Sequence, residues 1–315
     1  MEFDLIDRIR RRATARGDVL LGIGDDAALL QAPAGMLLAV ATDTLNAGVH
    51  FPDDTAPADI GWKALAVNLS DLAAMGATPA WATLSLSLPD ADAGWLEGFL
   101  DGFLELADAH GVALVGGDTT RGPLSVCVTV QGFVAPGAAL RRDGARVGDD
   151  VWVTGTLGDA AAALAQLRGG GTVDAGLRLR LDRPTPRVDT GLALAGLAHA
   201  AIDVSDGLLA DLGHLCSASG VGAGLSLAAL PASPPLRALA AGDALHALQA
   251  SGGDDYELCF TADPARAPAI AALARGGPGP TRIGRIVAGA GVRAFRGDGS
   301  QWRPGVAGYA HFRGG

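Results

Sequence analysis

Apolar segments with helical spacing alternate along this chain with shorter strand-like segments, and this alternation strongly constrains its fold. The first part of the chain has helical patterns at 2–15, 57–76 and 92–109, and strand-like patterns at 36–42, 82–88, 112–117 and 124–134. Segment 82–88, ATLSLSL, alternates strictly, as a half-buried strand does. Helices packed on an antiparallel or mixed sheet form an α+β sandwich. We therefore predict this architecture for the N-terminal part.

A turn-rich, polar stretch at 135–150 interrupts the alternation and indicates a domain boundary. A second set of elements follows it, with helices near 158–168, 187–199, 206–219 and 264–275, and strands near 151–155, 223–228, 255–261 and 281–287. The length of 315 residues also fits two domains. We predict an α/β (α+β) protein with an N-terminal domain over residues 1–137 and a C-terminal α/β sandwich over residues 138–315.

Charge and composition exclude several classes of protein. The net charge is −10 and the pI about 4.9, which argues against binding to nucleic acid or to an anionic membrane. No apolar run reaches the ~18 residues of a membrane span, and the charged N-terminus does not resemble a signal peptide. Three widely separated cysteines form neither a disulfide framework nor a zinc site. We expect a cytoplasmic protein.

Aspartate dominates the acidic residues, because only four of the 34 are glutamate. Six short stretches place Asp beside Gly, Ser or Thr where an apolar element begins or ends: GIGDD (22–26), TDT (42–44), NLSD (68–71), GGDTT (116–120), IDVSDG (202–207) and SGGDDYE (251–257). Carboxylates on turns can converge in a fold, and Mg²⁺ prefers oxygen ligands. Taken together, the stretches predict a site for magnesium and phosphate.

Each stretch also has a purely structural interpretation, because Asp commonly caps helices and Asp-Gly forms turns. Asp71 does not fit this interpretation, since it lies inside a helical pattern where Asp is a poor helix former. Asp203 and Asp206 are spaced i, i+3 at a strand-to-helix junction, so one could cap the helix while the other binds a cation.

Other routes to phosphate chemistry and covalent catalysis lack their usual motifs. Lys63 is the only lysine and has no preceding glycine-rich loop, so no P-loop is present. No Ser, Cys or His stands beside an activating base in a recognisable motif, and Cys127 and Cys259 fall in apolar runs typical of a core. His50 lies next to the acidic stretches and could contact substrate or only shape its loop.

Six motifs, in order and spacing, resemble those of the thiamine-monophosphate kinase family: GIGDDAALL (22–30), ATDTLNAGVHF (41–51), KALAVNLSDLAAMGATPAW (63–81), GGDTTRGPLSV (116–126), AIDVSDGLLADLGHL (201–215) and SGGDDYELCF (251–260). That family belongs to a wider group with aminoimidazole ribonucleotide synthetase and selenophosphate synthetase. The resemblance implies an N-terminal domain that forms a homodimer, ATP bound between the two domains, and several Mg²⁺ ions. It also implies transfer of phosphate from ATP to thiamine monophosphate, the last step of thiamine diphosphate biosynthesis.

The resemblance also assigns roles to individual residues. It implies Mg²⁺ ligation by Asp26, Thr42, Asp43, Asp71, Asp118, Asp203 and Asp206. It implies ATP contacts by Gly117, Asp118, Arg142 and Ser205, and contacts to thiamine monophosphate by His50 and Asp254. The chain departs from the family pattern at Ala41, where relatives can have a hydroxyl, at Asp254, where Glu is familiar, and at Val306, where an aromatic residue can stand.

Two further expectations follow. Without a suitable nucleophile, phosphate should pass directly, in line, from ATP to the acceptor, and the aspartates should act electrostatically. Strand 124–134 would leave a hazardous apolar edge if unpaired, which also favours a homodimer.

Three alternatives were weighed against this reading. A selenophosphate synthetase would need a cysteine near the N-terminal turn, and a hydrogenase-maturation relative would end in cysteine rather than HFRGG. A non-enzymatic acidic module would bind cations without nucleotide.

Overall fold

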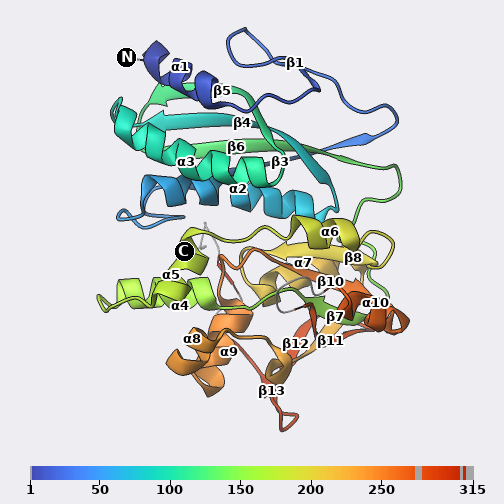
Figure 1. The fold of residues 1–315 in the computed structure, drawn as a ribbon. Coiled ribbons are helices and arrows are strands. Elements are labelled where there is room, and N and C mark those ends of the chain that lie inside the picture. The colour runs from blue at the N-terminus through green and yellow to red at the C-terminus, as the bar shows by residue number, and fades with distance from the viewer. Residues whose placement is uncertain (1, 274–278, 306–307, 310–315) are drawn as a thin grey trace. The chain divides into compact units, whose positions relative to one another are not determined.

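A four-stranded sheet covered by helices forms the N-terminal part of the computed structural model, which describes residues 2–273, 279–305 and 308–309 (Figure 1). The chain divides into two compact units. Unit 1 comprises Met1–Leu72 and Ala77–Gly137, and unit 2 comprises Ala73–Gly76 and Ala138–Gly315. Among the described residues, no helix is both long enough and apolar enough to cross a membrane.

Unit 1 contains α1 (Glu2–Arg12), β1 (Val19–Leu21), β2 (Leu29–Leu30), β3 (Leu37–Asn46), α2 (Pro57–Ala74), β4 (Thr78–Leu88), α3 (Ala93–Ala109), β5 (Ala113–Arg121) and β6 (Ser125–Val134). The strand order of the sheet is β3-β6-β4-β5. The β3–β6 and β6–β4 pairs are antiparallel and the β4–β5 pair is parallel, so the sheet is mixed, as predicted.

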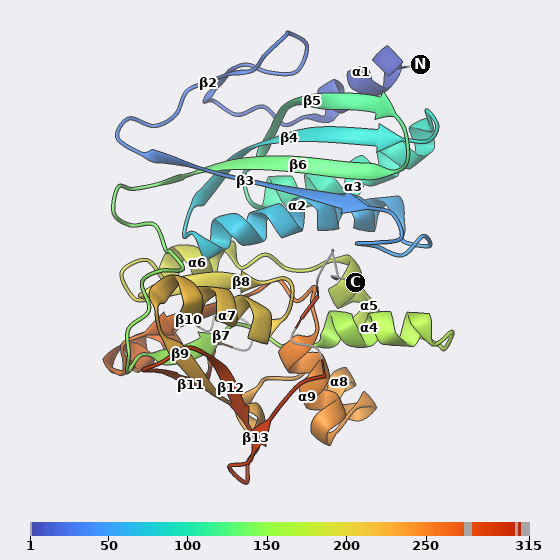
Figure 2. The ribbon, with the colours of Figure 1, turned by 180° about the vertical axis from the view of Figure 1, so that it is seen from behind.

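Helices α2 and α3 lie on one face of this sheet, as Figures 1 and 2 both show. Their backbones approach closely at two glycines. A Cβ on Gly102 would lie 1.7 Å from the Ala58 carbonyl oxygen, and one on Gly61 would lie 2.0 Å from the Phe99 carbonyl oxygen. Any side chain at these positions would therefore force the two helices apart.

The predicted alternation in β4 is confirmed, because Leu84 and Leu86 are buried while Ser85 is exposed. The prediction that segment 124–134 is a sheet edge is wrong. Strand β6 lies inside the sheet, and β3 is the edge strand beside it. The sequence pattern shows the apolar content of a strand but not its neighbours, which depend on long-range pairing.

Unit 2 has a seven-stranded sheet with the order β13-β12-β9-β11-β7-β10-β8. Its strands are β7 (Asp150–Val153), β8 (Ala200–Val204), β9 (Gly222–Ser226), β10 (Glu257–Ala262), β11 (Thr281–Val287), β12 (Gly291–Phe295) and β13 (Gln301–Trp302). Its helices are α4 (Asp159–Arg168), α5 (Ala175–Asp182), α6 (Val188–Ala193), α7 (Leu208–Ser219), α8 (Pro234–Leu239), α9 (Gly242–Ser251) and α10 (Ala267–Ala271), with 3₁₀ turns at Leu227–Ala229 and Pro264–Arg266.

Helix α7 packs on this sheet through Leu208, Leu212 and Leu215, which are fully buried in the main core. A second apolar cluster joins α4, α5 and α8. Two predicted helices are shorter than expected. The pattern over 187–199 gives only α6, and Gly196, with a φ of 75°, interrupts any continuation. The pattern over 264–275 gives a 3₁₀ turn and α10.

Candidate functional site

In unit 1, Asn68 ties the strand that holds Asp43 to the helix that holds Asp71. Asp43 lies on β3 opposite Val128, which is fully buried. The backbone N–H of Asp43 donates to Asn68 Oδ1 at 3.0 Å, and Asn68 Nδ2 donates to the Ala64 carbonyl at 2.9 Å. Asp71 follows Asn68 by three residues on α2, so the two share a helix face. Asn68 therefore ties β3 to helix α2, a role not predicted from the sequence although Asn68 lies in the NLSD stretch.

Thr42 does not share a side with Asp43, because successive residues on a strand point to opposite faces. The Thr42 hydroxyl donates to the Val128 carbonyl at 3.2 Å and also contacts the Thr129 hydroxyl. The two side chains therefore cannot bind one ion together, and only a backbone oxygen of Thr42 could act with Asp43.

The GIGDD and GGDTT stretches meet in unit 1, where Ile23 and Asp118 line one small pocket of about 90 Å³. Gly117 has its own structural requirement, since a Cβ there would lie 1.8 Å from the Leu84 carbonyl oxygen and the residue has a φ of 150°. Close strand packing alone thus explains why residue 117 is a glycine. Asp26 is exposed and lies three residues beyond Ile23.

His50 is held in the loop after β3 by hydrogen bonds on both its ring and its backbone. The ring Nδ1 accepts the Asn46 N–H at 2.9 Å, and the backbone carbonyl accepts from Lys63 Nζ at 2.9 Å. A ring that accepts at Nδ1 has its proton on Nε2 when neutral. Nε2 is then a donor suited to a phosphate or carbonyl oxygen.

In unit 2, the loop between β8 and α7 is organised by one carboxylate. Asp211 Oδ2 accepts the backbone N–H groups of Ser205, Asp206 and Gly207 at 3.0, 3.1 and 3.1 Å. The side chain comes from the first turn of α7 and reaches back over the loop. The sequence analysis missed Asp211, although its place within the AIDVSDGLLADLGHL motif could have drawn attention to it.

The charges around this loop favour a cation. Burial, together with the negative charges of Asp203 and Asp206, raises the pKa of Asp211 to about 7, against the lowering effect of the backbone N–H donors of Asp206 and Gly207. Asp203 is buried and Asp206 is half-buried. Excess negative charge on carboxylate oxygens attracts a hard divalent cation.

Arg142 lies in a turn fixed to the end of α7. Ser219 Oγ donates to the Arg142 carbonyl at 2.7 Å and accepts the Ala145 N–H at 3.1 Å, and the Ala201 N–H donates to the Arg141 carbonyl at 3.1 Å. The Arg142 side chain is exposed. Its backbone is therefore held in place while its guanidinium remains accessible.

Asp254 lies in a turn with an unusual backbone. Asp254 and Tyr256 have φ values of 68° and 50°, a region that costs a non-glycine residue about 1–3 kcal/mol. The turn is tied to the β8–α7 segment, because the Asp254 N–H donates to the Ser205 carbonyl at 2.8 Å and the Tyr256 N–H to the Val204 carbonyl at 2.8 Å. Two predicted site residues, Ser205 and Asp254, are thus joined directly.

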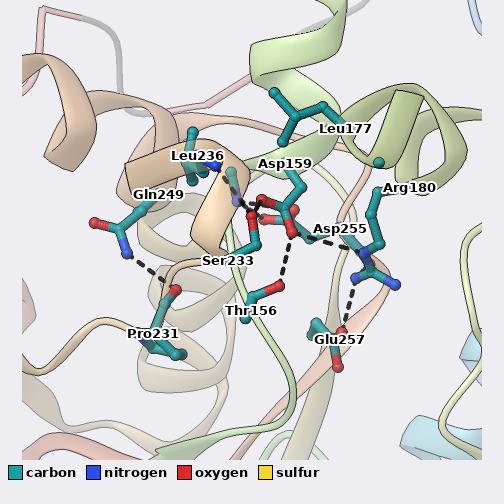
Figure 3. Close-up of polar contacts among 12 residues, drawn as sticks. Thr156, Asp159, Leu177, Arg180, Pro231, Ser233, Leu236, Gln249, Asp255 and Glu257 are labelled. Atoms are coloured by element: carbon teal, nitrogen blue, oxygen red, sulfur yellow. Dashed lines mark hydrogen bonds and ion pairs between the residues drawn. The ribbon is translucent and has the colours of Figure 1, made fainter. Parts of the chain in front are cut away.

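One buried acid, Asp255, lies within this turn, and a second, Glu257, follows it (Figure 3). Both carboxylate oxygens of Asp255 accept the Gly158 N–H, at 2.9 and 3.0 Å. Burial raises the pKa of Asp255 well above its ordinary value, although the Gly158 N–H and the Arg180 charge lower it. Glu257 is fully buried and accepts from Arg187 at 2.6 and 2.5 Å and from Arg180 at 2.8 Å.

Among the described residues, no three His, Cys, Asp or Glu side chains form a group that could hold a metal ion. The structure joins the backbone of Asp43 to Asn68, three residues before Asp71, and brings Asp203 and Asp206 near Asp211. The larger Mg²⁺ ligand set stays a prediction. Val306 lies outside the described residues.

Comparison with known proteins shows the family of the chain. Residues 24–134 match the AIR synthase related protein N-terminal domain, and residues 146–296 match the corresponding C-terminal domain. These matches place the chain in the class of two-domain AIR synthase related proteins. A thiamine-monophosphate kinase of Escherichia coli strain K12 is 48% identical over 99% of this chain and 98% of its own length, and one from Haemophilus influenzae is 46% identical over 84% and 82%. The chain belongs to the thiamine-monophosphate kinase family.

Solved structures support the same placement. A thiamine-monophosphate kinase from Stenotrophomonas maltophilia is 58% identical, with a TM-score of 0.88 over 95% of this chain and 97% of that chain. AaThiL complexed with AMPPCP and TMP is 33% identical, with a TM-score of 0.78 over 99% and 97%. Hydrogenase maturation protein HypE in complex with ATP, at 22% identity and a TM-score of 0.79, shares the fold.

Proposed function

We propose that this chain is an ATP-dependent thiamine-monophosphate kinase, which converts ATP and thiamine monophosphate to ADP and thiamine diphosphate. The observation that carries the proposal is the match along nearly the whole chain to thiamine-monophosphate kinases, including AaThiL complexed with AMPPCP and TMP. An assay of ADP release should show turnover with thiamine monophosphate and little with other phosphorylated metabolites. Equal turnover of unrelated phosphate acceptors would contradict the proposal.

The oxygen donors of both units fit Mg²⁺ as the metal. In unit 1 these are Asp26, Thr42, Asp43, Asp71 and Asp118, and in unit 2 they are Asp203 and Asp206. Bound Mg²⁺ would offset the repulsion between the phosphates of donor and acceptor. Among the proposed nucleotide contacts, Arg142 offers a charged bidentate donor, whereas Gly117 and Ser205 offer backbone or hydroxyl groups.

Asp71 gives a clean test of metal binding, because it is half-buried on α2 and Asn would nearly reproduce its packing. Asp71→Asn should fold normally and lose most activity, and part of the loss should return at higher Mg²⁺. Asp59→Asn, in the first turn of the same helix, is the matched control. Near-normal activity of Asp71→Asn at limiting Mg²⁺ would remove Asp71 from the site.

Direct in-line transfer is the mechanism we infer. The acceptor phosphate is already anionic and needs no general base, so the protein has to position the two substrates and offset charge. Cys216 and Cys259 are fully buried and do not serve as nucleophiles. A chiral γ-phosphate should therefore invert its configuration. Net retention, or a phospho-aspartate trapped before the acceptor is added, would contradict direct transfer.

A homodimer through unit 1 is supported by the exposed edge strand β3. Leu37, Leu38 and Val40 on this strand are 51%, 52% and 58% exposed. A ten-residue apolar edge strand invites pairing with another chain. Light scattering should give a particle of about twice the 31.5 kDa chain mass, and Val40→Lys should shift it toward the monomer. A monomer of the unsubstituted protein at micromolar concentration would contradict the dimer.

The main alternative is an acidic module that binds divalent cations without catalysis. It predicts that Mg²⁺ affinity is independent of nucleotide, whereas the kinase should bind Mg²⁺ more tightly with an ATP analogue present. Calorimetric titration with and without the analogue distinguishes the two. The role as last step of thiamine diphosphate biosynthesis and the cytoplasmic location stay predictions, which complementation of a thiamine-requiring strain and cell fractionation would test.

A further inference from the structure

The turn at Asp254–Tyr256 combines an unusual backbone with an unusually buried support. In the described part of the chain, Asp254 and Tyr256 are the non-glycine residues with positive φ. Residues in this region persist only where the surrounding structure holds them, and they cluster at functional sites. Contacts from the surrounding residues must therefore hold this turn in place.

Asp255, between the two strained residues, is only 1% exposed and accepts the Gly158 N–H with both oxygens. Gly158 has a φ of 91°, and a Cβ there would lie 2.8 Å from the Leu248 backbone, so this donor comes from a closely packed loop. Asp255 therefore fixes the middle of the turn to the start of α4.

Glu257, the first residue of β10, anchors the C-terminal end of the turn. It is bound by Arg187 and Arg180 and also accepts from the Thr154 hydroxyl at 2.6 Å. Figure 3 shows Asp255 and Glu257 with Arg180 in this buried network. Asp159, which accepts from Thr156 and Ser233, lies in the same network. The strained turn thus has rigid attachments in both directions.

The Tyr256 side chain acts on Asp254 itself. Its hydroxyl donates to Asp254 Oδ1 at 3.1 Å, while the residue as a whole is only 8% exposed. A buried ring with one fixed hydroxyl restricts the Asp254 carboxylate to one orientation. Asp254 is half-buried, so the carboxylate is oriented without being enclosed.

We propose that Tyr256 and Asp255 are positioning residues that hold the Asp254 carboxylate for thiamine monophosphate, an inference that rests on the proposed function. A carboxylate repels phosphate and attracts the cationic thiamine portion of the substrate. Loss of its orientation should therefore weaken binding of thiamine monophosphate and leave binding of ATP nearly unchanged. A network that serves only folding would change both equally, or neither.

The test is a double-mutant cycle between Tyr256→Phe and Asp254→Ala, read as the KM for each substrate. Tyr256→Phe keeps the buried ring and removes one hydrogen bond to a charged group. It should raise the KM for thiamine monophosphate roughly tenfold, with the KM for ATP within about twofold. In the Asp254→Ala background, Tyr256→Phe should cause no further change. Thr261→Val, a hydroxyl deletion at a buried position of β10, is the control and should leave both KM values unchanged.

Asp255→Asn provides a second arm, because the amide keeps the size of the side chain. It should raise the KM for thiamine monophosphate selectively if it folds, and if it does not fold, the Tyr256 cycle decides. Additive effects in the cycle, or equal changes in both KM values, would overturn the inference. If the unsubstituted protein binds ATP but neither binds nor phosphorylates thiamine monophosphate, the proposed function fails first and the inference falls with it.

Discussion

Lys63, the only lysine of the chain, donates from Nζ to the backbone carbonyl of His50 at 2.9 Å, while its side chain is buried within unit 1. Lysine is rarely buried so completely unless it is paired. Lys63 does not act as a P-loop lysine. Its hydrogen bond instead holds the loop that contains His50, a proposed contact to the substrate. The connection joins helix α2, which holds Asp71, to the loop that presents the His50 ring.

Replacing Lys63 by Met removes its charged amine but keeps a similar buried aliphatic chain, so the variant isolates the contribution of the amine. Lys63→Met keeps most of the buried volume but leaves the His50 carbonyl without this donor, which should cost about 1–3 kcal/mol of unfolding free energy. We also expect a higher KM for thiamine monophosphate because the His50 loop is loosened. Urea unfolding and steady-state kinetics check both. Arg8→Ala, at an exposed ion pair with Glu97, is the control and should change stability by under about 1 kcal/mol. Unchanged stability of Lys63→Met would show that the hydrogen bond contributes little.

Much of the fold could be predicted from local patterns in the sequence. The alternation in ATLSLSL predicted β4, and the helical pattern over 92–109 predicted α3, where the Asp92 side chain accepts the N–H groups of Gly94 and Trp95. These features depend on neighbours close in the chain. Strand order is different, because the edge position of β3 follows from pairing with β6 about ninety residues later.

In the candidate site too, some features could be predicted from the local sequence and others depend on the folded chain. Motif spacing was sufficient to select Asp71, Asp203 and Asp254 as candidates. It could not show Asn68 bridging β3 and α2, or Asp211 reaching back to three N–H groups, because both roles depend on side-chain direction in the folded chain. Both residues lie inside the quoted motifs, so the motifs located the region but not the positioning groups.

Asp211 should control metal dependence without binding the metal itself. Asp211→Asn keeps the side-chain size but turns an acceptor-only group into one that also presents N–H₂ to the loop. Groups that orient metal ligands typically contribute 10–100-fold to metal affinity or activity. We therefore expect the Mg²⁺ concentration for half-maximal activity to rise by about tenfold or more. Asp174→Asn is the control, because Asp174 caps α5 by accepting the N–H groups of Gly176 and Leu177. An unchanged Mg²⁺ requirement in Asp211→Asn would contradict the role.

Glu257 should be important for stability. Burial alone would lower the pKa of the Arg187 guanidinium, but the hydrogen bonds and charge of Glu257 outweigh this and raise that pKa above its ordinary value. Glu257→Gln removes the buried negative charge that Arg187 and Arg180 share. Breaking one side of a buried pair costs about 3–5 kcal/mol. Thermal and chemical unfolding should show a loss of this order. Asp243→Asn, at an exposed pair with Arg296, is the control and should cost under about 1 kcal/mol. Equal losses in both variants would contradict the prediction.

The buried thiols of unit 2 should make stability fall at high pH. Burial raises the pKa of Cys216 from 9.0 to about 11, and burial raises that of Cys259 further. Because the folded state holds these protons more tightly, their contribution is fully present below pH 9 and is lost as pH rises from there toward 11. Between pH 8 and pH 10, ionisation of Cys216 alone should lower the free energy of unfolding by about 1 kcal/mol.

Cys216→Ala isolates this contribution from the other groups that titrate at high pH. The variant should be less stable than the unsubstituted protein at pH 8 because of the atoms removed from the core, and the difference should narrow by about 1 kcal/mol at pH 10. Urea unfolding at both pH values measures it. Cys127→Ala, at a half-buried position on β6, is the comparison variant.

Alkylation of the buried thiols gives an independent check. At pH 8 only about one Cys216 thiol in a thousand is ionised, so iodoacetamide should modify Cys216 and Cys259 only after unfolding. Rapid labelling of either residue in the native protein would show that unit 2 opens locally and that the thiols are not held protonated by burial.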